Sequence, residues 1–198
     1  MIKAIIFDAG GVYFQGSFID FVNRSYKILG IENRDFIDKK LIFNPDYNRG
    51  EITAEECFRN YFGVPISEKQ MEKILDFWTT TWKLNDEMVN LVRRLKENYK
   101  LAILSNSDLI NSEKYTERGW YSPFDVLVLS HEEGILKPER KIYEIVLEKL
   151  GMSPEECVFI DDQKEALLPA KEMGMKTILY ESIEQLEREL DDLGVKFN

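Results

Sequence analysis

Short apolar runs alternate with amphipathic segments along most of this chain, and this alternation restricts the fold more than any other feature of the sequence. The first run, residues 2–7, ends shortly before the glycine pair Gly10 and Gly11. From Asn85 onward, strand-like runs lie at 101–104, 126–129, 158–160 and 177–180, and helical periodicity lies at 88–95, 142–150, 166–173 and 183–193. Such alternation predicts an α/β fold whose parallel sheet is covered by helices on both faces.

Residues 15–82 interrupt this alternation and have only helical patterns. Apolar side chains recur at helical spacing from Phe18 to Leu29, and Gly30 ends that segment. Residues 44–50 are rich in Asn, Pro and Gly and are expected to form a loop. Two pairs have the spacing of capping boxes that begin further helices, Thr53 with Glu56 and Ser67 with Gln70. We therefore predict an α/β core at 1–14 and 83–198, and an all-helical cap at 15–82.

Polar side chains follow several of the predicted strands, where ligands of open α/β sheets bind. Asp8 follows the first strand, and alone it fits an ordinary surface turn equally well. Mg²⁺ prefers oxygen ligands and Lys binds phosphate oxygens, so the other polar groups favour a phosphoryl site. A carboxylate nucleophile in such a site can form an aspartyl-phosphate. These other groups are Ser105 and Asn106, Lys137 in a loop, and Asp161 and Asp162.

This ordered set of groups resembles the motifs of the haloacid dehalogenase superfamily, most closely its phosphatase-like members with a helical cap after the first motif. Any one motif alone is weak evidence, whereas four in the right order are specific. The resemblance extends nearly end to end and implies a Rossmann-like parallel sheet core with an inserted helical cap. The segments that carry it are 7–12, 104–106, 137–138 with Ile142 and Tyr143, and 159–162 with Ala170, Gly174 and Met175.

The resemblance implies a Mg²⁺ site at the first and last of these motifs. Asp8 would be both the nucleophile and a metal ligand, and Gly10 would offer its backbone carbonyl. Asp162 would bind the metal directly, with Asp161 beside it. Many relatives have an Asn at the position of Ala166 that orients these carboxylates, so the support of the metal site is expected to differ in this chain.

The resemblance also implies a phosphate site. Ser105 and Asn106 would bind the phosphate, and Lys137 would neutralise charge on the phosphoryl oxygens and on the nucleophile. The chain departs from the usual pattern at Gly10, where phosphatases of this type have a second Asp as general acid and base. General acid–base catalysis contributes about 10²–10⁴-fold. Slower turnover or a preference for good leaving groups is therefore expected.

We predict a Mg²⁺-dependent phosphatase that hydrolyses a small phosphorylated metabolite through an aspartyl-phosphate on Asp8. A phosphotransferase or phosphomutase that shares this intermediate stays open. So does a catalytically weakened relative that binds a ligand or a protein, because Gly10 and Ala166 depart from the pattern. Dehalogenation fits poorly, since it needs no metal and leaves the acidic pair 161–162 unexplained. Arg49 in the cap is interpreted as a surface residue, with contact to the non-phosphate end of the substrate as the alternative.

Composition restricts the possible partners. The 198 residues carry a net charge of −10 with a pI near 4.8, which disfavours nucleic acid, whose binding depends on Lys and Arg. Too few residues precede Asp8 for a signal or membrane-spanning segment, so we expect no membrane partner and a cytoplasmic location. Cys57 and Cys157 are expected to be buried or half-buried thiols, and His131 to lie in a solvated loop. The sequence does not indicate an oligomeric state.

Overall fold

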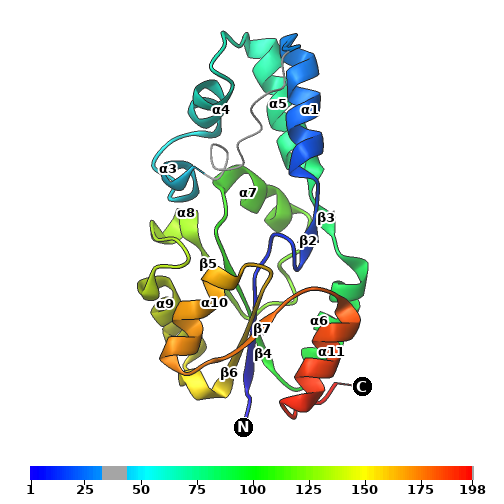
Figure 1. Cartoon of the computed structure of the whole chain (residues 1–198), viewed down its shortest axis with the longest axis vertical. Coiled ribbons are helices and arrows are strands. Elements are labelled where there is room, and N and C mark those ends of the chain that lie inside the picture. Colours follow the sequence, from blue (N-terminus) through cyan, green and yellow to red (C-terminus); the bar gives the residue numbers. More distant parts are fainter. Residues whose placement is uncertain (33–43, 198) are drawn as a thin grey trace.

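The computed structural model describes residues 1–32 and 44–197 (Figure 1). Within them, parallel strands form one five-stranded sheet in the order β5-β4-β1-β6-β7, which confirms the predicted parallel sheet. β1 lies at its centre and is wholly buried, as its apolar sequence requires. The strands are β1 (Ala4–Phe7), β4 (Lys100–Ser105), β5 (Val126–Leu129), β6 (Cys157–Asp161) and β7 (Lys176–Leu179).

Helices cover both faces of this sheet (Figure 1). Ile5 and Phe7 of β1 face one cluster of buried side chains, which includes residues of α6 (Asp86–Leu95) and α11 (Ile183–Asp192). Ala4 and Ile6 point to the opposite face, where they pack with α9 (Arg140–Leu150) and α10 (Lys164–Met173). The alternation of side chains along β1 therefore supplies both halves of the core. A short 3-10 helix, η1 (Pro154–Glu156), precedes β6.

A helical insertion follows β1, as predicted, and lies beyond the carboxyl end of the sheet (Figure 1). Its described helices share one aromatic-rich core. Both predicted capping boxes are present, at the starts of α4 and α5. Residues 44–50 differ from the expected loop, because Asn44 caps a short helix that has Pro45 in its first turn. The described helices are α1 (Phe18–Leu29), α3 (Pro45–Asn48), α4 (Ala54–Phe62) and α5 (Glu68–Thr81). Residues 33–43 of the predicted cap lie outside the described residues.

The chain passes between sheet and insertion along two short strands. β2 (Phe14–Gln15) pairs antiparallel with β3 (Lys83–Leu84), so both crossings lie side by side. These strands coincide with the predicted domain boundaries, and we retain the division into core and cap as a proposal. Gly16 follows β2, and a Cβ there would lie 2.6 Å from a ring atom of Trp82. This close approach fixes the two crossings against each other.

Two further helices were not predicted. α7 (Leu109–Glu117) is only weakly amphipathic, because it lies between the sheet and the insertion and buries polar side chains such as Asn111. α8 (Ser130–Glu133) contains His131, which is half-buried within a helical turn instead of lying in a solvated loop. Both cysteines are free and buried, as expected. In the described part of the chain, no helix has the length and apolar character needed to cross a bilayer.

Candidate active site

The structure brings the predicted site residues together at the carboxyl end of the sheet. Asp8 directly follows β1, and its backbone N–H donates to the carbonyl of Ile160 in β6 at 2.8 Å. Ser105 ends β4 and Asp161 ends β6, so all three side chains begin from adjacent central strands. All three are buried. The parallel strands thus bring polar groups that lie far apart in the sequence together at one edge of the sheet.

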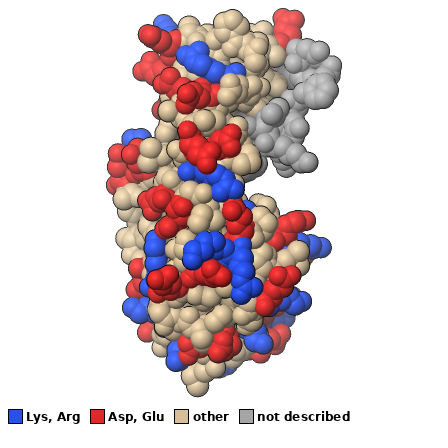
Figure 2. Space-filling view, turned by 90° about the vertical axis from the view of Figure 1, so that its left-hand side faces the viewer, with Lys and Arg blue, Asp and Glu red and all other residues tan. Residues whose placement is uncertain are grey.

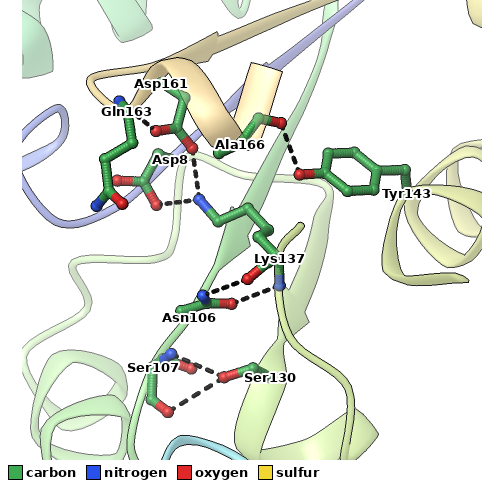
Figure 3. A network of polar contacts seen from close by, with 9 residues as sticks. All are labelled: Asp8, Asn106, Ser107, Ser130, Lys137, Tyr143, Asp161, Gln163 and Ala166. Carbon is green, nitrogen blue, oxygen red and sulfur yellow. Dashed lines mark hydrogen bonds and ion pairs between the residues drawn. The ribbon is translucent and has the colours of Figure 1, made fainter. Parts of the chain in front are cut away.

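Lys137 lies at the centre of the site (Figure 3). Its ammonium group is 2.6 Å from Asp8 Oδ1 and 2.6 Å from Asp161 Oδ2, and all three side chains are almost inaccessible to solvent. Burial alone would lower the pKa of Lys137, but the two carboxylates outweigh it and raise that pKa. Lys137 therefore carries a permanent positive charge between the predicted nucleophile and the acidic pair.

The environment of the Asp8 carboxyl group disfavours its charged form. Burial raises its pKa to about 7, the Lys137 ammonium opposes that rise, and the carboxylates of Asp161 and Asp162 add to it. Three carboxylates thus share one ammonium. A divalent cation would relieve this imbalance, and it would favour the ionised form of Asp8 that a nucleophile requires.

Asp8, Asp161 and Asp162 fit such a cation. Each offers a carboxylate oxygen, and these oxygens lie within 4.8 Å of one another. The backbone N–H of Gln163 donates to Asp161 Oδ1 at 2.8 Å, and Lys137 binds the other oxygen of this carboxylate. Asp162 is exposed toward solvent. An all-oxygen set with one side open to water suits Mg²⁺, which retains part of its hydration shell in proteins.

Gly11 is a site residue that sequence reasoning did not single out. Its φ of +87° lies in the left-handed region, and a Cβ at this position would collide with the carboxylate of Asp162. Glycine therefore satisfies a backbone requirement and a steric one at the same position. The signal was present as the second glycine after Asp8, but only the packing of Asp162 reveals its purpose.

Gly10, at the position of the missing acid, differs from its neighbour. It is exposed, its φ lies outside the left-handed region, and a Cβ there would have no atom of the described residues within 4 Å. No described side chain therefore occupies the position where the Cβ of an Asp at residue 10 would lie. A side chain at this position requires no change of backbone conformation.

Asn106 holds the Lys137 loop through the backbone (Figure 3). Its Nδ2 donates to the Lys137 carbonyl at 2.9 Å, and its Oδ1 accepts from the Lys137 N–H at 2.7 Å. The side-chain amide of Asn106 thus positions Lys137. The predicted phosphate contacts of Ser105 and Asn106 stay predictions, for which the backbone N–H of Asn106 remains a candidate donor.

Ala166 has no side-chain amide that could orient the carboxylates in the way the resemblance implies for an Asn at this position. The Ala166 carbonyl accepts a 2.6 Å hydrogen bond from the buried Tyr143 hydroxyl group, which joins α10 to α9. Asp161 is oriented instead by Lys137 and by the backbone of Gln163, two residues farther along (Figure 3). An Asp that binds its own i+2 N–H is an ordinary local turn. The sequence alone does not indicate that the backbone of Gln163 provides this support.

Comparison with known proteins identifies relatives across nearly the whole chain. A family model described as haloacid dehalogenase-like hydrolase matches residues 2–174. The chain is 30% identical over 178 residues to the sesquiterpene phosphatase astK of Aspergillus oryzae, covering 87% of each protein. It is 44% identical over 121 residues to the bifunctional epoxide hydrolase 2 of Rattus norvegicus, where the match covers 58% of this chain and 22% of that protein.

Solved structures give a similar result. A haloacid dehalogenase family enzyme from Bacteroides thetaiotaomicron, solved in complex with magnesium and inorganic phosphate, has a TM-score of 0.75. It is 27% identical, and the match covers 94% of this chain and 99% of that one. The similarity therefore includes both the sheet and the helical insertion.

Proposed function

Because the chain belongs to the haloacid dehalogenase-like hydrolase family, we propose that it hydrolyses a small phosphorylated metabolite through an aspartyl-phosphate on Asp8. It is a hydrolase of the phosphatase branch that acts on phosphate monoesters with Mg²⁺. The observation that carries the proposal is the Lys137 ammonium between Asp8 and Asp161, with Asp162 nearby. Such an excess of carboxylates serves a cation and a phosphoryl group, whereas dehalogenation at carbon needs neither.

The geometry supports a proposed role for each charged group. Asp8, Asp161 and Asp162 would hold Mg²⁺, which supplies charge neutralisation at the phosphoryl oxygens. Lys137 binds Oδ1 of Asp8, so we assign Oδ2 as the atom that attacks phosphorus. The Lys137 ammonium then lies next to the reacting centre and stabilises the negative charge of the transferred group.

The lack of a carboxylic acid at Gly10 supports a preference among leaving groups. A leaving alkoxide needs a proton, and no carboxylic acid stands at this position to donate one. Aryl and anomeric phosphates leave as weaker bases than simple alkyl phosphates do. We therefore propose a metabolite whose phosphate is attached to an acidic or anomeric hydroxyl group. Its identity depends on the cap, and the phosphatase relatives carry names of different substrates.

An inorganic phosphate release assay tests this proposal. The purified chain should release phosphate from an aryl phosphate and from a member of a metabolite panel with Mg²⁺, and chelation should abolish release. Asp8→Asn should fold normally but lose turnover by orders of magnitude, because an amide cannot form the acyl-phosphate. Absence of release from every substrate by the folded wild-type chain would instead support a ligand-binding relative. The cytoplasmic location stays a prediction.

A further inference from the structure

The turn after α3 in the insertion is bonded directly to the loop that carries Lys137. Arg49 Nη1 donates to the Gly134 carbonyl at 2.9 Å, and Arg49 Nη2 pairs with Glu139 Oε1 at 2.6 Å. These two partners lie on either side of Lys137 in the sequence. The planar guanidinium group can hold both because its donors are fixed in a fork.

A second contact links the end of α3 to the loop after β4 through Ser130. Ser130 Oγ donates to the Asn48 carbonyl at 2.6 Å. The same oxygen accepts from the Ser107 N–H at 2.9 Å (Figure 3). Gly50 lies so close that a Cβ would be 2.7 Å from the His131 carbonyl oxygen. The turn is therefore in close contact with the core, and Arg49 is part of a tightly fitted surface.

Both contacts lie next to residues that are predicted to bind phosphate, Lys137 and the pair 105–106. Glu139 Oε1, the partner of Arg49, also accepts from the N–H of Leu136, the residue before Lys137, at 3.1 Å. Ser107 follows the predicted phosphate-binding pair 105–106. The end of α3 and the turn after it thus contact the Lys137 loop directly, and they are linked to the loop after β4 through Ser130.

We propose that Arg49 is a positioning residue, which sets the Lys137 loop from the cap and so adjusts the phosphate site itself. This inference rests on the proposed phosphatase function. Asn106 already holds the middle of the loop, and Arg49 holds its two sides through Gly134 and Glu139. Loss of Arg49 leaves the Lys137 ammonium less restrained between the carboxylates, and small displacements of a charge-stabilising group reduce the rate strongly.

This role differs from substrate recognition by Arg49. A residue that contacts the leaving group changes KM in a manner that depends on the substrate, and it leaves the affinity for inorganic phosphate unchanged. A residue that positions Lys137 changes the affinity for inorganic phosphate and kcat for every substrate. Because basic and acidic side chains are interspersed on the face that carries α3 and α8 (Figure 2), the effect of net charge needs its own control.

The test compares three variants with the wild-type chain, after circular dichroism has confirmed that each is folded. Arg49→Met removes the fork, and Arg49→Lys keeps the charge without the fork. Arg140→Met removes a cation near Glu139 whose own partner is the exposed Glu144. Calorimetry gives the Kd of inorganic phosphate with Mg²⁺, and steady-state kinetics on two aryl phosphates of different size give kcat and KM.

We expect Arg49→Met to weaken phosphate binding and lower kcat by about 2- to 30-fold, equally for both substrates. Arg49→Lys should retain most of the defect, and Arg140→Met should behave as the wild type. Full recovery in Arg49→Lys, an equal defect in Arg140→Met, or a change confined to the KM of one substrate would overturn the inference. The Kd of inorganic phosphate can be measured without turnover. A wild-type chain that binds phosphate but releases none from any substrate would therefore contradict the proposed function and leave the role of Arg49 testable.

Discussion

Two adjacent glycines after Asp8 have opposite tolerances for a side chain. Gly11 has a left-handed backbone and faces the Asp162 carboxylate, whereas Gly10 has an ordinary φ and open space around its Cβ position. A carboxylate can therefore be introduced at the first position and not at the second. The backbone conformation at residue 10 thus does not require glycine, and the absence of the second Asp removes a catalytic group without a steric reason.

We expect Gly10→Asp to accelerate hydrolysis of alkyl phosphates more than that of aryl phosphates. The gain on alkyl substrates should be about tenfold or more, because general acid catalysis can contribute ~10²–10⁴-fold. Phosphate release from matched aryl and alkyl substrates measures it. Gly11→Asp is the control, since it should lower stability and activity on both. A wild-type rate that is independent of the leaving-group pKa would show that another group already supplies the proton.

The raised pKa of Asp8 predicts how stability depends on pH without metal. Its folded-state pKa is about 7 against an ordinary value of 3.8, so the stabilisation by its bound proton is complete below pH 3.8 and is lost as the pH rises through about 7. In chelator, Asp8→Asn should therefore gain stability over the wild type as the pH rises from about 4 to about 7, since the amide stays neutral. Urea unfolding measures the difference, and a wild-type chain that gains on the variant over this range would refute the prediction.

At the scale of single elements, we propose that the carboxyl end of β6 supports metal binding. Asp161 ends this strand and Asp162 follows it, beside the end of β1. Glu133 is also acidic but ends α8, where it pairs with Lys149. Position relative to the strand ends, and not charge alone, should decide which carboxylate matters.

Asp162→Ala should weaken the apparent Mg²⁺ affinity by more than about tenfold, because even outer-shell partners of metal ligands contribute that much. Glu133→Ala removes the same charge away from the strand end and should leave the affinity unchanged. Phosphate release at a series of Mg²⁺ concentrations gives both values. Equal affinities in the two variants would mean that Asp162 is not a ligand.

For the whole molecule, the paired strands β2 and β3 determine how the insertion is joined to the sheet. Gly16 lies at this junction against the ring of Trp82 and the carbonyl of Thr81, and its φ is not in the left-handed region. A methyl group there meets only a steric barrier. Its effect therefore reports on how tightly the two crossings are packed.

Gly16→Ala should reduce the free energy of unfolding by about 1–3 kcal/mol, as overpacking commonly does. Gly10→Ala is a matched control, since its φ is also ordinary and its Cβ position is open. This control should change the free energy of unfolding little. Urea denaturation of both variants measures the difference, and equal stability would show that the Trp82 ring moves aside at no cost.

The sequence alone determined the fold class and most of the polar groups of the site. Strand and helix periods are local properties, so the parallel sheet and the helical insertion could be predicted from the spacing of apolar side chains. Asp8, Asp161 and Asp162 could be singled out because each follows a strand-like run, and such ends meet at one edge of a parallel sheet. Elements without a clean local period, such as α7 and α8, could not.

Only the tertiary structure decided how these groups are supported. Arg49 contacts residues 85 and 90 positions away, and no local pattern encodes a bond over that separation. The crowding at Gly11 likewise depends on where Asp162 packs, and the sequence does not distinguish this glycine from the adjacent Gly10, whose Cβ position is open. Local spacing assigns a side chain to a strand end, whereas long-range packing decides which atoms surround it and therefore how it acts.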